Sequence, residues 1–187
     1  KFDINTCKIG KNISIGFDDL VLKIIKNNIK DLSLEAKVIN SGFLESNKGV
    51  HINQKLELSA LTNKDVECIK IGVENKIKFF ALSFANKHHD VIQLRNLIPY
   101  QSYLISKIET DSAIKNIKKI TENSNALLVD RGDLSRYVKL ELIPYAQKYI
   151  VDVGIKKNTP VFIATNLLEN MIKFNFCTRI YFATMLS

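Results

Sequence analysis

Residues 1–52 contain short runs of β-branched residues that lack the spacing of an amphipathic helix. The runs lie at 13–15, 20–25 and 32–39, and the polar segment 26–31 separates two of them. Runs of this kind, divided by Asn, Asp and Gly, predict strands joined by a hairpin. We therefore expect a small antiparallel β domain over residues 1–52.

From residue 53 onward the pattern changes to apolar strands that alternate with amphipathic helices. Strands are predicted at 79–84, 103–108, 126–129 and 160–164, and helices at 62–74, 87–97, 111–122, 140–155 and from 167. Strands with few polar residues, each followed by a helix, are typical of a parallel sheet buried on both faces. We therefore expect a second domain with an α/β fold over residues 53–187.

The length of the repeat distinguishes two α/β architectures. A strand and its helix together take about thirty residues, which is the average unit of a (β/α)8 barrel. We expect four consecutive units of such a TIM barrel, with part of a doubly wound sheet as the alternative. No glycine-rich phosphate-binding loop follows a predicted strand, which weakens the nucleotide-binding form of that alternative.

Residues capable of chemistry follow the carboxyl ends of the predicted strands. They are Ser83, Lys107 with Glu109, Asp133 and Thr165. Barrel active sites are built at this edge, from the ends of several strands. Lys107 and Glu109 point to the same face of an extended strand, where burial of their charges is unfavourable unless a ligand or metal uses them. Two carboxylates from neighbouring strands suit Mg²⁺, and a lysine beside them would neutralise a phosphoryl oxygen.

Each of these residues also has a purely structural interpretation. Lys107 and Glu109 would then form a salt bridge, and Asp133 would cap a turn. The hydroxyl groups of Ser83 and Thr165 would bond to the backbone at strand ends. Their joint placement at one edge of the sheet favours a functional site over these separate explanations.

The composition is that of a soluble globular protein, with 46% hydrophobic and 25% charged residues among 187. The formal net charge of +8 is a feature shared with nucleic-acid-binding proteins. The lysines are scattered along the chain, however, and form no block or helical stripe. We therefore expect no nucleic-acid partner, and the positive field suits a phosphorylated substrate.

The cysteines and the lack of targeting signals bear on the cellular compartment. Cys7, Cys68 and Cys177 lie far apart and form no CxxC pair, which favours reduced thiols over disulfides or a zinc site. The sequence contains no signal peptide and no apolar run long enough to span a membrane. We therefore expect a cytoplasmic protein that does not associate with membranes.

Three segments at predicted strand ends resemble motifs of the pyruvate kinase family. Ile105-Ser-Lys-Ile-Glu109 is similar to the strand that carries the family's lysine and metal-binding glutamate. Val129-Asp-Arg-Gly-Asp-Leu134 resembles its A-R-G-D-L segment, and residues 163–171 resemble its A-T-Q-M-L-E-S-M segment. Shorter matches occur in the same order at 48–50, 58–61 and 83–84, so the resemblance runs from about residue 8 to Arg179.

This resemblance implies a (β/α)8 barrel with a small β lid inserted after its third strand. Residues 1–52 would form most of the lid, and residues 53–187 would contain barrel strands four to seven. The implied reaction transfers the phosphoryl group of phosphoenolpyruvate to ADP and gives pyruvate and ATP, the last step of glycolysis. The implied cofactors are Mg²⁺ (or Mn²⁺) and K⁺.

The resemblance also implies a role for each matched residue at the barrel edge. Lys107 would stabilise the transferring phosphoryl group. Glu109 and Asp133 would bind the Mg²⁺ ion, and the ion would in turn bind the substrate oxygens. Thr165 would contact the substrate near the carbon that is protonated.

Further matched positions concern cofactor and substrate binding. By this resemblance Lys48, Arg131 and Gly132 would be cofactor-binding residues. The backbone amides of Arg131 and Gly132 would also contact the substrate carboxylate. One neighbouring position departs from the family pattern. Asp130 replaces a small residue ahead of Arg131, and we expect it to disturb the carboxylate pocket.

The matched segments leave out the family's first three barrel strands, its last strand and its carboxyl-terminal regulatory domain. The three missing strands carry family residues that help to bind phosphate, K⁺ and nucleotide. A half barrel exposes strand edges, so we expect a homo-oligomer or a pair with a complementing half-barrel. The alternative function is that of a catalytically inactive remnant, or one half of a split enzyme, that acts only as an interaction module.

Overall fold

The computed structural model describes residues 4–16, 20–46, 48–54 and 58–165. The chain forms two compact units, residues 1–59 and 60–187. Each unit has its own sheet and its own hydrophobic core. The boundary drawn from the sequence, after residue 52, falls inside the first of these units.

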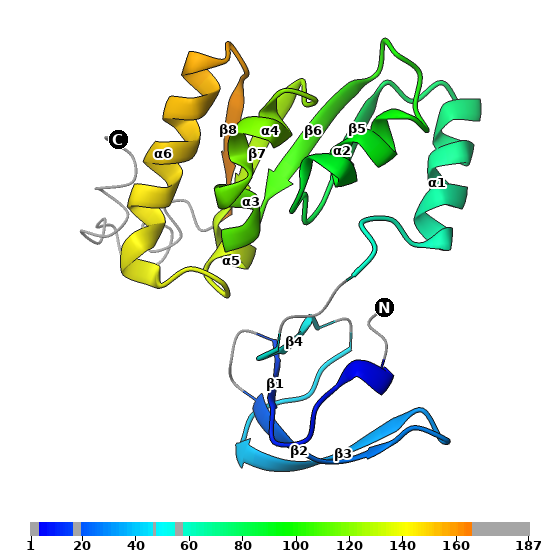
Figure 1. Ribbon diagram of the computed structural model, residues 1–187, viewed down its shortest axis with the longest axis vertical. Helices are drawn as coiled ribbons and strands as arrows, with labels where there is room; N and C mark the ends of the chain where they lie inside the picture. Colours follow the sequence, from blue (N-terminus) through cyan, green and yellow to red (C-terminus); the bar gives the residue numbers. More distant parts are fainter. Residues whose placement is uncertain (1–3, 17–19, 47, 55–57, 166–187) are drawn as a thin grey trace. The chain divides into compact units, whose positions relative to one another are not determined.

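Among its described residues, the N-terminal unit forms a four-stranded antiparallel sheet with the order β3-β2-β1-β4 (Figure 1). Its elements are η1 (Ile4–Thr6), β1 (Asn12–Ile15), β2 (Leu20–Asn28), β3 (Ser33–Asn40) and β4 (Val50–Ile52). Cys7, Ile13, Ile24 and Ile52 form its small buried core. The β-branched runs therefore form the antiparallel structure that they predict.

In the described part of the C-terminal unit, four parallel strands alternate with helices (Figure 1). The elements are α1 (Asn63–Glu74), β5 (Phe79–Leu82), α2 (His88–Arg95), β6 (Tyr103–Ile108), α3 (Asp111–Lys115), α4 (Ile117–Thr121), β7 (Ala126–Asp130), α5 (Arg131–Leu134), η2 (Leu140–Leu142), α6 (Ile143–Lys156) and β8 (Val161–Ala164). The mixed α/β class predicted for this part of the chain is confirmed.

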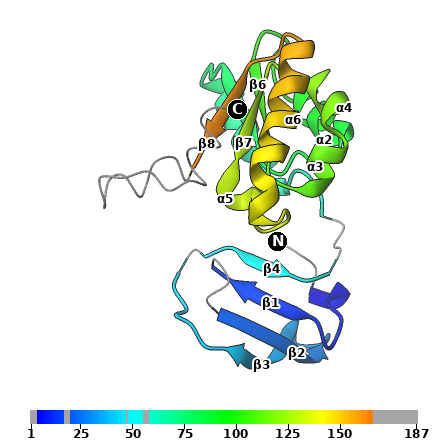
Figure 2. The same cartoon turned by 90° about the vertical axis from the view of Figure 1, so that its left-hand side faces the viewer.

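The order of the parallel strands is β5-β6-β7-β8, so each strand pairs with the next one in the chain. Consecutive barrel strands follow this order, whereas a doubly wound sheet reverses at a switch point. The helices α2, α3, α4 and α6 lie on one side of the strands (Figure 2). Both features favour consecutive barrel units over the doubly wound alternative.

The face of the sheet that the helices cover carries the core of this unit. Leu104 and Ile108 alternate along β6 and are fully buried. Ile117 and Ile120 of α4 and Ile150 of α6 belong to the same buried cluster. Buried residues at every second position of the strand thus pack against buried residues at every third or fourth position of the helices, and together they form one apolar layer.

The opposite face of the sheet is partly exposed, so the expectation of burial on both faces was wrong. Phe79 lies beside Tyr103 in the register, and Leu128 lies beside Phe162. Phe79 and Phe162 are 68% and 50% exposed. An apolar strand has the same sequence pattern whether its second face packs against a helix or faces the interior of a barrel. In the part of the chain that the structure describes, helices cover one face of this sheet.

Three predicted elements differ in their details from the structure. The buried strand expected at 79–84 ends at Leu82, which is its only buried residue. The helix expected at 111–122 is interrupted at Asn116, where the side-chain Nδ2 of Asn116 donates to the backbone oxygens of Ser112 and Asn86. The helix expected from residue 167 lies outside the described residues.

Two helix starts agree with the sequence. The Thr62 hydroxyl accepts a hydrogen bond from the Asp65 amide, and the Asp65 carboxylate accepts one from the Thr62 amide, which forms a capping box. Pro144 lies in the first turn of α6, where its missing amide hydrogen is not needed.

Among the described residues, no helix combines the length and the apolar composition needed to cross a membrane.

Candidate functional site

Strand β6 positions the first two candidate residues at its carboxyl end. Its side chains alternate, with Ile108 fully buried toward the helices and Lys107 on the open face. Glu109 follows the strand, and Thr110 then caps α3 by accepting a hydrogen bond from the Ala113 amide. The change from strand to helix therefore fixes Glu109 at the sheet edge, where it is fully buried.

Lys107 connects two carboxylates from neighbouring strands. Its Nζ atom lies 2.6 Å from Glu109 Oε1 and 3.1 Å from Asp130 Oδ2. The side chains of Lys107, Glu109 and Asp130 are 22%, 1% and 12% exposed. The salt bridge between Lys107 and Glu109, expected if Lys107 were purely structural, is thus present. Lys107 also forms an ion pair with a second acid, Asp130 of β7.

The loop after β5 completes the surroundings of Glu109. Its Oε2 atom accepts a hydrogen bond from the backbone amide of Phe84, a residue with a φ of 53°. Ser83, the candidate at this strand end, is exposed in the turn before Phe84. The backbone of this loop, rather than the Ser83 hydroxyl, therefore supports the site.

The end of β7 continues directly into α5, with Asp130 as the N-cap. Asp130 Oδ1 accepts hydrogen bonds from the Asp133 amide at 3.4 Å and from Thr165 Oγ1 at 3.0 Å. The Gly132 amide donates to Thr165 Oγ1 at 2.9 Å, and the Arg131 guanidinium donates to the Thr165 backbone oxygen. Thr165, the residue after β8, is therefore held against the end of β7.

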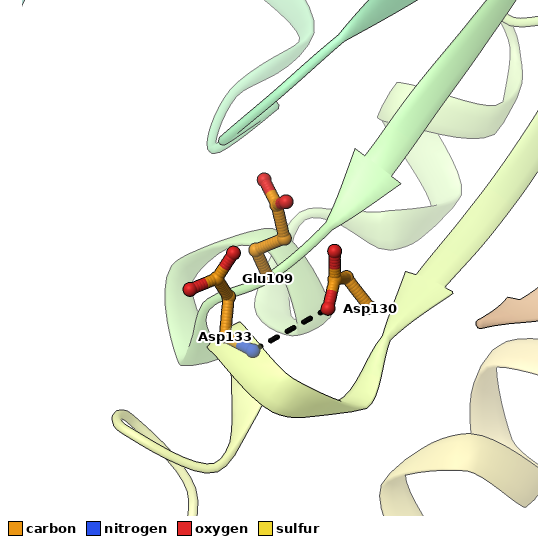
Figure 3. Close-up of side chains that lie close together, drawn as sticks. All are labelled: Glu109, Asp130 and Asp133. Carbon is orange, nitrogen blue, oxygen red and sulfur yellow. Dashed lines mark hydrogen bonds between the residues drawn. The ribbon is translucent and has the colours of Figure 1, made fainter. Parts of the chain in front are cut away.

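Three carboxylates gather at this edge of the sheet. Glu109, Asp130 and Asp133 each offer an oxygen atom, and these atoms lie within 4.8 Å of one another (Figure 3). Glu109 Oε1 is buried and makes the ion pair with Lys107. Hard carboxylate oxygens suit a divalent cation such as Mg²⁺, so the residues present fit this metal.

The pKa values of the two acids Glu109 and Asp130 shift in opposite directions because burial and the hydrogen-bond partners weigh differently at each. Burial raises the pKa of Glu109 above its ordinary value, although Lys107 and the Phe84 amide oppose the change. Burial would also raise the pKa of Asp130, but hydrogen bonds from Lys107 and Thr165 outweigh it and lower this pKa. Burial would lower the pKa of Lys107, but Glu109 and Asp130 raise it. Lys107 therefore stays a cation at neutral pH.

Most of the predicted residues lie together in the C-terminal unit, and one belongs to the N-terminal unit. Lys107, Glu109, Arg131, Gly132, Asp133 and Thr165 lie at neighbouring strand ends of the C-terminal unit. Lys48 belongs to the N-terminal unit, where it forms an ion pair of 2.6 Å with Glu45.

Two residues of the site were not predicted as members of it. Asp130 was expected to disturb the carboxylate pocket but not to contact Lys107, although its position two residues after Leu128 places it on the face of Lys107. Arg136 Nε lies 3.7 Å from Asp133 Oδ1. Arg136 has the i,i+3 spacing of a helical pair with Asp133, but the short helix α5 on which this contact depends was not predicted from the sequence.

Comparison with known proteins identifies relatives for almost the whole chain. The family described as "Pyruvate kinase, barrel domain" matches residues 3–184. The pyruvate kinase of Thermotoga maritima is 33% identical over 176 residues, which are 92% of this chain and 37% of that protein. The pyruvate kinase of Staphylococcus aureus strain MRSA252 is 33% identical over 174 residues, which are 90% of this chain and 29% of that protein. The chain thus spans about a third of the length of these relatives, and it belongs to the pyruvate kinase family.

Proposed function

We propose that this chain takes part in the transfer of a phosphoryl group from phosphoenolpyruvate to ADP, which gives pyruvate and ATP. The observation that carries this proposal is the position of Lys107 Nζ between Glu109 and Asp130, beside Asp133, at the carboxyl ends of β6 and β7. Phosphoryl transfer depends on positioning and on neutralised charge more than on covalent chemistry. A lysine next to a carboxylate cluster supplies both.

Glu109 and Asp133 are the residues that would hold Mg²⁺ or Mn²⁺ in this proposal. Their carboxylate oxygens are close enough to bind one ion together. When bound, the cation would supply positive charge to the oxygens of the substrate. The Lys107 ammonium would neutralise charge on the transferring phosphoryl group, because its raised pKa keeps it protonated at neutral pH.

Thr165 and the start of α5 would orient the rest of the substrate. The Thr165 hydroxyl bonds to Asp130 and accepts from the Gly132 amide, so its direction is fixed. It would lie near the carbon that is protonated when pyruvate forms. The amides of Arg131 and Gly132 would meet the substrate carboxylate, in place of the present contact between Gly132 and Thr165.

The finer fold assignment is part of the same proposal. Residues 53–187 would be strands four to seven of a (β/α)8 barrel, and the unbroken order β5 to β8 with helices on one side supports this. Residues 1–52 would be most of an inserted β lid that carries Lys48 as a cofactor-binding residue. The K⁺ requirement and the cytoplasmic location rest on the family and its glycolytic reaction alone.

A second candidate function is an interaction module, or one half of a split enzyme. The partly exposed sheet face with Phe79 and Phe162 supports it, since such a face would be covered in a closed barrel. A homo-oligomer or a complementing half-barrel would cover that face. In this case the site would become complete only in the assembly.

A coupled assay of pyruvate formation tests the proposed function. We expect pyruvate formation that depends on ADP and Mg²⁺ and falls by about 10²–10³-fold in Lys107→Met, because one charge-stabilising group is lost. Lys118→Met is the matched control, because Lys118 is an exposed lysine on α4 and its removal leaves the site intact. Activity of the unmodified chain no higher than that of Lys107→Met would exclude catalysis by the isolated chain and would favour the interaction module.

A further inference from the structure

Asp130 takes up hydrogen-bond donors that a bound anion would otherwise use. Its Oδ2 atom lies 3.1 Å from Lys107 Nζ, and its Oδ1 atom accepts from the Thr165 hydroxyl at 3.0 Å. The Asp133 amide donates to the same Oδ1 atom at 3.4 Å. Lys107 and Thr165 are the two side chains that the proposed function assigns to the substrate.

The position of Asp130 is fixed by the fold on both sides. It is the last residue of β7, paired with Ala164 of β8, and it caps α5. Its carboxylate is largely buried on the face that carries Lys107. A substrate carboxylate or phosphoryl group that approaches Lys107 therefore meets a fixed negative charge, and like charges at this range repel.

We propose that Asp130 is an internal competitor of the substrate anion. Its carboxylate binds the Lys107 ammonium and the Thr165 hydroxyl. A phosphorylated carboxylic acid must therefore take these two donors from Asp130 in order to bind. The identity of the acid rests on the proposed function, whereas the competition for Lys107 rests on the contacts of Asp130 alone. Asp130 thus weakens the binding of anions at this site.

Two other roles for Asp130 make different predictions. A helix cap alone predicts that removal of the charge lowers stability and leaves anion affinity unchanged. A third cation ligand predicts that removal of the charge weakens divalent-cation binding. Like-charge repulsion by itself also predicts tighter binding of anions after removal of the charge, but only the competitor role makes that gain depend on Lys107.

Isothermal titration calorimetry with phosphoenolpyruvate and with inorganic phosphate, at a fixed excess of Mg²⁺, tests the proposal. Asp130→Asn keeps the size of the side chain and an oxygen that can accept from Thr165, but it lacks the charge. We expect both anions to bind at least about tenfold more tightly to Asp130→Asn. Asp152→Asn, at an exposed position on α6, should bind them as the unmodified chain does.

Two additional variants keep the result interpretable. Asp130→Ser retains a preferred N-cap side chain and should show the same gain if Asp130→Asn does not fold. In the double variant Lys107→Met/Asp130→Asn the gain should disappear, because the released lysine is the group that binds the anion. A gain that persists without Lys107 would overturn the proposal.

The remaining outcomes separate this inference from the proposed function. Binding by the unmodified chain with no gain in Asp130→Asn or Asp130→Ser overturns the inference and leaves the function standing. A gain without any pyruvate formation supports the inference and contradicts the function. Absence of anion binding in all variants overturns both the inference and the function. Weaker binding of Mn²⁺ by Asp130→Asn in the absence of anions, measured by electron paramagnetic resonance, would make Asp130 a cation ligand instead of a competitor.

Discussion

Asp130 and Glu109 both contact Lys107, yet their pKa values move in opposite directions. The pKa of Asp130 is lowered below the ordinary 3.8, because the hydrogen bonds from Lys107 and Thr165 outweigh burial. The pKa of Glu109 is raised above 4.5, because burial dominates. The ionised form of Asp130 therefore stabilises the fold, whereas ionisation of Glu109 opposes folding.

The stability of Asp130→Asn follows from this difference. The contribution of Asp130 is fully present above its unfolded pKa near 3.8 and is lost as the pH falls toward the lower folded pKa. We expect Asp130→Asn to lower the free energy of unfolding by about 2 kcal/mol at pH 7, the typical value of a charged hydrogen bond. Urea unfolding from pH 7 to pH 3 should show this difference shrinking, while Asp152→Asn stays near the unmodified chain. A difference that is constant over this range would contradict the ion pair.

The sequence predicted Lys107, Glu109 and Asp133 because the two-residue repeat of a strand, and the approximate place where the strand ends, are visible in the local pattern. It predicted that Asp130 disturbs the carboxylate pocket but not its contacts with Lys107 and Thr165, because the strand was expected to end at Val129 and in fact includes Asp130. Because β7 includes this additional residue, the Asp130 carboxylate lies on the face of the sheet that carries Lys107. Strand boundaries are set by pairing with β8, which local pattern does not contain.

At the scale of elements, Gly154 shows how closely α6 packs on the start of β8. A Cβ atom at Gly154 would lie 2.3 Å from Val161 Cγ2 and 2.8 Å from the Thr159 backbone oxygen. At such distances the Val161 side chain and the backbone at Thr159 would have to shift.

Replacement of two helical glycines by alanine should have opposite effects. Gly154→Ala should lower the free energy of unfolding by about 1–3 kcal/mol, because the overlap with Val161 outweighs the gain in helix propensity. At Gly72 of α1 the nearest atom to the new Cβ would be Phe80 Cε1, at 3.4 Å. Gly72→Ala should therefore be neutral or stabilise by up to about 1 kcal/mol. Equal stabilities of the two variants in thermal unfolding would contradict this packing.

The positions of helices and strands were predictable because apolar spacing differs between the two. The start of α1 was predictable from Thr62 and Asp65, since a capping box is contained in four residues. The interruption at Asn116 was not, because the helical spacing of Ile114, Ile117 and Ile120 continues through it. Its partner is the backbone of Asn86, which is distant in sequence and near only in the fold.

At the scale of the whole molecule, the partly exposed face of the parallel sheet should govern association. Phe79 and Phe162 lie on that face and are largely exposed. Apolar surface of this kind drives self-association in water. The sequence could not distinguish this face from a covered one, because apolar strands are common to both cases.

Substitution on this face should shift the chain toward the monomer. We expect the unmodified chain to form oligomers in light scattering, and we expect Phe79→Gln/Phe162→Gln to have a lower mean mass. Tyr100→Gln is the control, because Tyr100 is 91% exposed but lies in the connection between α2 and β6. A compact, stable monomer of the unmodified chain would contradict the expected role of this face.

Binding of Mn²⁺, followed by electron paramagnetic resonance, tests most directly whether the ends of β6 and β7 form a divalent-cation site. We predict a single tight site per chain, weakened about 10–100-fold in Glu109→Gln and in Asp133→Asn, because each variant removes a charged oxygen ligand. Asp152→Asn should bind Mn²⁺ as the unmodified chain does. Equal Mn²⁺ affinity of the unmodified chain and of Glu109→Gln/Asp133→Asn would contradict the assignment of these carboxylates to a metal.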